Sequence, residues 1–153
     1  MTSKKKKEYF RRIYKNIEEN GFHTTYVMEE DNFTPFGYST GIYKNFKIPE
    51  IFISGLPVNL TGELIKNYAD KYKSESIPLD KKITGLTDRF SVYFIKVTND
   101  SLNEYILSSI KYYEGSEYEY IQLIFPDLNG RFPNEIGYNY DQKIFGKLEL
   151  NNL

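Results

Sequence analysis

The sequence predicts an α+β domain in which a mixed or antiparallel sheet of about five strands packs against about three helices. Three observations lead to this prediction. Some segments carry apolar residues at the three- and four-residue spacing of a helix, and others are short and rich in β-branched and aromatic residues. The two kinds of segment follow no regular strand–helix repeat, which argues against a doubly wound parallel sheet.

The N-terminal half is predicted to hold two helices and three strands. Apolar residues between Phe10 and Ile17 share one face of a helix over residues 4–20, which Gly21 ends. Strands are expected over residues 22–29, 36–43 and 50–54, and an acidic turn at residues 29–32 separates the first two. Pro57 suits the first turn of the second helix.

The C-terminal half is predicted to alternate strand, helix and strand after a loop over residues 74–87 that contains at most one short strand. The strands cover residues 89–97 and 118–125. Ser101 and Glu104 have the spacing of a capping box, so the third helix should begin there and end at Gly115. Asp127 to Gly130 form a turn, and the final twenty residues or so are expected to be loop, with one short edge strand left open.

Length and composition indicate one cytoplasmic domain. The 153 residues are expected to fold as a single domain over residues 1–153, with residues 1–7 as a flexible basic tail. The absence of cysteine removes disulfides and thiolate metal sites, and it favours a reducing compartment. No apolar run follows the charged N-terminus, and no segment has the roughly 18 apolar residues of a membrane span. We therefore expect a cytoplasmic protein with no membrane partner.

Charge and motifs exclude several classes of function. With 20 basic and 21 acidic residues the net charge is −1, which argues against nucleic acid as a partner. Basic residues do cluster within residues 4–15, which leaves open a contact of this helix with phosphate, a membrane surface or nucleic acid. Neither glycine-rich nucleotide pattern nor a nucleophile elbow is present. The one histidine, His23, has no cysteine with which to share zinc, so no catalytic residue, cofactor or metal is predicted.

Three segments together are similar to a known family. Residues 36–42 read FGYSTGI, residues 49–56 read PEIFISGL, and residues 121–133 read IQLIFPDLNGRFP. In order and spacing they resemble the bacterial family termed domain of unknown function 4262, whose members read Y-T-x-G-L, P-E-L-x-x-x-G-L and Q-x-x-W-P-D-x-x-G-R-F-P-W. The matching residues are Tyr38, Thr40, Gly41, Pro49, Glu50, Gly55, Gln122, Pro126, Asp127, Gly130, Arg131 and Pro133.

Two positions depart from the family pattern. Phe125 stands where the family has tryptophan, and Asn134 replaces the tryptophan after the last proline. A ligand pocket lined by that second tryptophan in relatives would be lost or altered here. The family carries no established activity, so the resemblance implies kinship and no particular chemistry.

A polar cleft is one hypothesis for a functional site, either for a small ligand or for an enzyme's substrate. Pockets are mostly apolar with a few convergent polar groups. The candidates for such groups are Tyr38, Thr40, Glu50, Gln122, Asp127 and Arg131. The alternative is structural: Asp127 caps its turn, and Arg131 pairs with Glu50 or with Asp127 itself.

A protein-binding surface is the other hypothesis, and it is the favoured one. A small domain with 15 Tyr and 11 Phe fits a non-catalytic module of immunity or antitoxin type that docks on a toxin-like or basic protein. The candidate interface residues are Tyr112, Tyr113, Glu114, Glu117, Tyr118, Glu119 and Tyr120. The alternative is that alternate tyrosines of this segment face the core.

Overall fold

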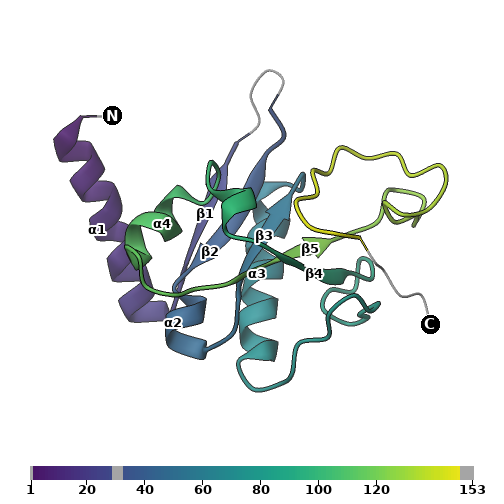
Figure 1. Ribbon diagram of the computed structural model, residues 1–153, viewed down its shortest axis with the longest axis horizontal. Coiled ribbons are helices and arrows are strands. Elements are labelled where there is room, and N and C mark those ends of the chain that lie inside the picture. The colour runs from purple at the N-terminus through teal and green to yellow at the C-terminus, as the bar shows by residue number, and fades with distance from the viewer. Residues whose placement is uncertain (1, 29–32, 149–153) are drawn as a thin grey trace.

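The computed structural model describes residues 2–28 and 33–148, which build a mixed five-stranded sheet with helices around it (Figure 1). The strands are β1 (His23–Val27), β2 (Phe36–Thr40), β3 (Glu50–Ser54), β4 (Tyr93–Val97) and β5 (Tyr120–Ile124). Their order in the sheet is β1-β2-β3-β5-β4. Only the β3–β5 pair of this sheet is parallel, since the other neighbours run antiparallel. The predicted α+β class with a mixed sheet is confirmed.

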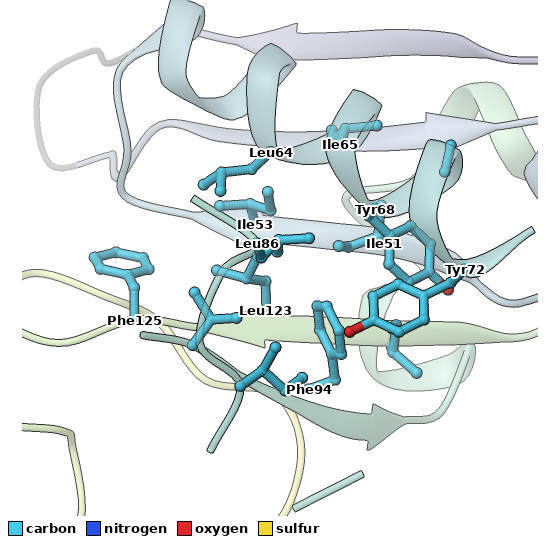
Figure 2. Packing of buried hydrophobic residues seen from close by; sticks show 14 of the residues in the cluster. Ile51, Ile53, Leu64, Ile65, Tyr68, Tyr72, Leu86, Phe94, Leu123 and Phe125 are labelled. Carbon is cyan, nitrogen blue, oxygen red and sulfur yellow. The ribbon is translucent and has the colours of Figure 1, made fainter. Parts of the chain in front are cut away.

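One face of the sheet is covered by the helix over Val58–Tyr72, α3. The helical segments are α1 (Ser3–Asn20), α2 (Ile42–Phe46), α3 (Val58–Tyr72), α4 (Leu107–Tyr113) and the 3-10 turn η1 (Asp100–Leu102). In Figure 2, Leu64, Ile65, Tyr68 and Tyr72 of α3 lie against Ile51, Ile53, Phe94 and Leu123 of the sheet. The three- and four-residue spacing on α3 puts these side chains on one stripe, which is why the helix lies flat on the sheet.

The other face is covered by irregular chain as well as helix. Phe52, Tyr93 and Ile95 of the sheet pack there against Ile106, just before α4, and against Phe145 of the C-terminal segment. Helix α1 packs beside β1 at the edge of the sheet (Figure 1). Its contact residues Ile13 and Ile17 are buried, whereas its first two turns are largely exposed.

Two predicted elements are shorter than expected. The strand expected over residues 36–43 ends at Thr40, and the chain continues as α2 because its first N–H groups find a side-chain acceptor, described below. The helix expected from Ser101 is broken into η1 and α4. The Ser101 hydroxyl donates to the Thr98 carbonyl at 2.7 Å and so does not cap a continuous helix.

The remaining boundaries shift in smaller ways. The strand predicted over residues 89–97 begins at Tyr93, and Val92 forms an isolated bridge with Ile83. Residues 3–7, expected as a tail, belong to α1 because the Thr2 side chain caps that helix by accepting from the Lys5 N–H. Residues 134–148 contain no helix or strand, as predicted for a loop, whereas the acidic turn at residues 29–32 lies outside the described residues. No helix in the described part of the chain is long and apolar enough to cross a membrane.

Candidate functional site

Glu50, the first residue of β3, is a fully buried carboxylate surrounded by hydrogen-bond donors. Three consecutive backbone N–H groups, of residues 41–43, donate to it at 2.8, 3.1 and 3.2 Å. The Ser39 hydroxyl donates at 2.7 Å, and the Tyr113 hydroxyl donates from α4. One side chain thereby joins β2, α2, β3 and α4.

Gly41 gives α2 the direction that brings its N–H groups to Glu50. Its φ of +107° lies in the region that favours glycine, and it turns the chain from β2 into the helix. A Cβ at this position would lie 2.9 Å from Ile17 Cγ2 of α1. The N-terminal N–H groups of a helix have no partner within the helix, so the Glu50 carboxylate satisfies donors that would otherwise be orphaned.

Burial dominates the ionisation of this cluster. It raises the pKa of Glu50 above the ordinary value of 4.5, although the hydrogen bonds from Tyr113, Ser39 and the backbone act in the opposite direction. Burial and then the charge of Glu50 raise the pKa of Tyr113 and of Tyr120, so both hydroxyls stay protonated. Since Glu50 is enclosed and its partners belong to the chain, the cluster is structural.

The interface candidates divide between the core and the surface. Tyr113 and Tyr120 are only 6% and 1% exposed. The Tyr113 hydroxyl donates to Glu50, and the Tyr120 hydroxyl donates to the Ser39 carbonyl at 2.7 Å. Both tyrosines therefore lie in the interior and not on the predicted surface, because the segment alternates its side chains between the core and solvent.

The other interface candidates, together with Tyr43, form a surface that we call the acidic tyrosine face, which consists of Tyr43, Tyr112, Glu114, Glu117, Tyr118 and Glu119. Its glutamates are exposed and its tyrosines are half-buried. Burial raises the pKa of Tyr43, and the charges of Glu117 and Glu119 raise it further, so the negative potential of these side chains reaches α2. Sequence reasoning missed Tyr43 because residues 36–43 were expected to be one strand.

Asp127 holds the turn after β5. It is 5% exposed and accepts from the backbone N–H groups of Asn129, Arg131 and Asn139, each at 2.9 Å. The Arg131 Nε lies 3.4 Å from Asp127 Oδ2, so the pairing expected as the structural alternative is present. Burial alone would raise the pKa of Asp127, but these hydrogen bonds and the Arg131 charge hold it below the ordinary value of 3.8.

The structure does not bring the six cleft candidates together. Glu50 pairs in register with Tyr120 at the start of β5, whereas Asp127 and Arg131 follow the end of that strand. The five residues of β5 alone span about 13 Å at about 3.3 Å per residue. The hypothesis of one cleft around Glu50, Asp127 and Arg131 is therefore wrong, because they lie toward opposite ends of the sheet.

Two further cleft candidates are occupied inside the fold. Gln122 is fully buried and ties the C-terminal segment to β5, since it donates to the Lys143 carbonyl at 2.6 Å and accepts from the Phe145 N–H at 2.9 Å. Thr40 is also fully buried, with its hydroxyl 2.7 Å from that of Ser109. Both side chains have partners within the chain and serve the packing of the domain.

Tyr38 is the cleft candidate that faces a real cavity. A hollow of about 790 Å³, which we call the α1 pocket, lies between α1, the β1–β2 pair and the segment from η1 to α4. Its walls include Tyr9, Phe10, Phe33, Phe36, Tyr38 and Tyr105, and its remaining lining is Lys6, Thr25, Val27, Glu104, Leu107, Ser108 and Lys111. The sequence offered no signal for this pocket, because its lining comes from segments about 100 residues apart.

The α1 pocket has hydroxyl groups as well as charged side chains in its lining. The Ser108 N–H donates to the Tyr38 hydroxyl at 3.1 Å, and the Ser108 hydroxyl lies 3.4 Å from that of Tyr9. Thr25 stands opposite Tyr38 across the antiparallel pair. Its Oγ1 is enclosed, and its interaction with the Tyr38 hydroxyl lowers the pKa of Tyr38 slightly against the larger effect of burial, which raises it.

His23, the first residue of β1, is half-buried and hydrogen-bonded to α1. Its Nδ1 lies 2.9 Å from the Asn16 Nδ2, which can only donate, so the neutral ring carries its proton on Nε2. Burial, and to a smaller extent Arg12, lower the pKa of His23 below 6.5. Across residues 2–28 and 33–148, no three acidic, histidine or cysteine side chains gather in a way that could hold a metal ion.

Comparison with known proteins gives a family and no activity. No curated protein and no solved structure is similar enough to count as a match. The model of a family described as Domain of unknown function (DUF4262) matches residues 16–139, which covers the sheet, α2, α3, α4 and the Asp127 turn. Most of α1, with the pocket residues Lys6, Tyr9 and Phe10, lies before the matched range. The chain belongs to the DUF4262 family.

Proposed function

We propose that this protein is a non-catalytic protein-binding module of immunity or antitoxin type in the bacterial cytoplasm. Its partner is a basic, toxin-like protein that docks on the acidic tyrosine face. The observation that supports this best is that the exposed Glu117 and Glu119 act on the half-buried Tyr43. Glu114 is paired with Lys111, and Lys44 lies over the Tyr112 ring, so among the described residues Glu117 and Glu119 supply the unpaired negative charge of this surface. Tyrosine provides apolar contact area with a polar tip, and the glutamates steer a positively charged partner.

The acidic tyrosine face rests on a rigid base, which favours binding. Tyr118 stacks on Tyr113 with the ring centroids 4.5 Å apart. Tyr113 is in turn held by the hydrogen bond to Glu50, and Tyr112 packs edge-on against it at 5.0 Å. Side chains that are ordered before a partner arrives lose less conformational entropy on binding.

A non-catalytic role is supported by the state of the two buried carboxylates. Glu50 and Asp127 each accept several hydrogen bonds from the chain's own groups. General acid–base catalysis needs a group within hydrogen-bond reach of a substrate proton. Carboxylates engaged in this way serve the fold and offer little to a substrate.

The test begins with recovery of the partner from the native host by the tagged protein, followed by affinity measurements with purified components. We expect Glu117→Lys to weaken binding by about 10-fold, because it reverses a charge that attracts the partner. Glu75→Lys is the matched control, since Glu75 is also exposed and outside the helices and strands. Tyr118→Ala should weaken binding as well, through lost contact area.

The result that supports the proposal is one stoichiometric protein partner whose affinity falls with Glu117→Lys and stays within about 2-fold with Glu75→Lys. Inhibition of that partner's activity by the wild-type protein would identify it as a toxin and this chain as its immunity protein. Equal affinities for the two variants, or the lack of any stoichiometric partner, would contradict the proposal.

A further inference from the structure

We propose that the α1 pocket binds a small amphipathic anion, a molecule with an aromatic or chain-like apolar body and one anionic group. The pocket is formed mainly by α1, by the β1–β2 pair and by the chain around the start of α4. The acidic tyrosine face lies instead on α2, the end of α4 and the chain before β5. The inference is therefore independent of the proposed protein partner.

The size and walls of the pocket suit a small molecule. Its volume of about 790 Å³ lies within the range of about 300–1,000 Å³ that is usual for ligand sites. Most of its lining is aromatic or aliphatic, and Leu107 at its edge leaves 61% of its surface exposed. A ligand that covers these groups would remove apolar surface from water, which favours binding.

The charge around the pocket favours an anion, since its charged lining is Lys6, Lys111 and one carboxylate, Glu104. A second hollow of about 580 Å³ adjoins the pocket and shares Lys6, Phe10 and Lys111 with it. The second hollow also includes Lys7 and Arg11. Among the described residues, Lys111 pairs with Glu114 at 2.9 Å, but no ion pair is formed by Lys6, Lys7 or Arg11.

The place where the two hollows meet gives the ligand its orientation. The apolar body fills the α1 pocket, and the anionic group lies at the shared edge beside Lys6, within reach of the cations of α1. Tyr9 and Tyr14 of α1 approach Ser108 and Tyr112 of α4, so the shared edge lies between these two helices, where Lys6 and Lys111 are exposed. A charged group there keeps much of its hydration while the apolar body is buried.

The test uses anilinonaphthalene sulfonate as the anionic probe and N-phenylnaphthylamine as the uncharged probe with the same rings. We expect saturable binding of one sulfonate probe per folded chain by calorimetry. Lys6→Glu should weaken that binding by about 5-fold and leave the uncharged probe nearly unaffected. Lys15→Glu, on an exposed position of the same helix, is the control with the same change in net charge.

A second pair of variants tests the apolar wall without risk to the core. Leu107→Ala should weaken both probes by about 3-fold, because the removed methyl groups lie at the pocket. Leu128→Ala is the control, since Leu128 is 94% exposed and lies outside the pocket. Far-UV and near-UV circular dichroism of each variant should match the wild type.

Three outcomes would overturn the proposal. One is binding that does not saturate, and another is equal weakening by Lys6→Glu and Lys15→Glu, or by Leu107→Ala and Leu128→Ala. The third is a concentration-dependent dimer that Leu107→Ala dissociates, which would assign the pocket to a second copy of the chain. None of these results bears on the protein partner, so the two proposals can fail separately.

Discussion

The Glu50 carboxylate organises one end of the sheet because the donors around it come from three different elements. Backbone N–H groups arrive from α2, a hydroxyl from β2 and another from α4. A buried carboxylate without such donors would be strongly unfavourable, and donors without the carboxylate would be left unsatisfied. The residue therefore couples the position of three elements through one side chain.

Glu50→Gln should lower the free energy of unfolding by about 3 kcal/mol, because the new amide N–H₂ faces donors that need an acceptor. Urea denaturation at neutral pH would measure the loss. Glu63→Gln, at a half-exposed glutamate, should change stability by less than about 0.5 kcal/mol. A Glu50→Gln protein as stable as the wild type would show that the carboxylate is not needed.

The same residue predicts a pH dependence. Because burial raises the folded-state pKa of Glu50 above 4.5, the folded state holds this proton more tightly than the unfolded chain does. The resulting stabilisation is fully present below 4.5 and is lost as pH rises through the folded-state pKa. The stability difference between wild type and Glu50→Gln should therefore shrink as pH is raised from 4.5 to neutrality. A difference that grows with pH would mean that the hydrogen bonds outweigh burial.

At the scale of elements, the regular segments were predictable and the segments held by distant partners were not. Helices α1 and α3 and strands β1, β3 and β5 lie within the predicted ranges to a few residues, because their apolar spacing shows on the local sequence. Helix α2 was missed because Tyr43 and its neighbours suit a strand, and Glu50 stabilises the helix from another strand. The prediction of a single cleft around Glu50, Asp127 and Arg131 was wrong for a similar reason, since the register of the strands decides which residues lie close together.

Two glycines give a matched test of this element-level interpretation. Gly41→Ala should destabilise the protein by about 2 kcal/mol, because φ is +107° and the new Cβ would contact Ile17 of α1. Gly62→Ala should instead stabilise it by about 0.5–1 kcal/mol, since this glycine lies inside α3 with no atom within 4 Å of the added carbon. Thermal denaturation of both variants distinguishes the signs, and a neutral Gly41→Ala would contradict the tight turn into α2.

In the molecule as a whole, the two faces of the sheet are covered by different kinds of structure, a regular helix on one and irregular chain on the other. Helix α3 closes one face with a regular stripe, as the sequence predicted. The opposite face is closed by Ile106 and by the segment after β5, whose lack of periodicity indicated a loop but not its packing role. That role depends on single aromatic residues and on Gln122. The Gln122 side chain hydrogen-bonds the backbone of Lys143 and Phe145, whereas a strand in this place would have been held by backbone hydrogen bonds.

If the C-terminal segment is part of the cooperative core, it should respond to mutation like a core element. Phe145 packs edge-on against Phe52 and Tyr105, with ring centroids 5.4 and 4.9 Å away. Phe145→Ala should cost about 2 kcal/mol of unfolding free energy and speed hydrogen exchange in β3 and β5, because it uncovers their inner face. Ile136→Ala, in the same segment but 99% exposed, should cost less than about 0.5 kcal/mol. Faster exchange confined to residues 140–148 would show instead that this segment opens independently, and the sheet would then owe its stability to α3 and the chain around α4.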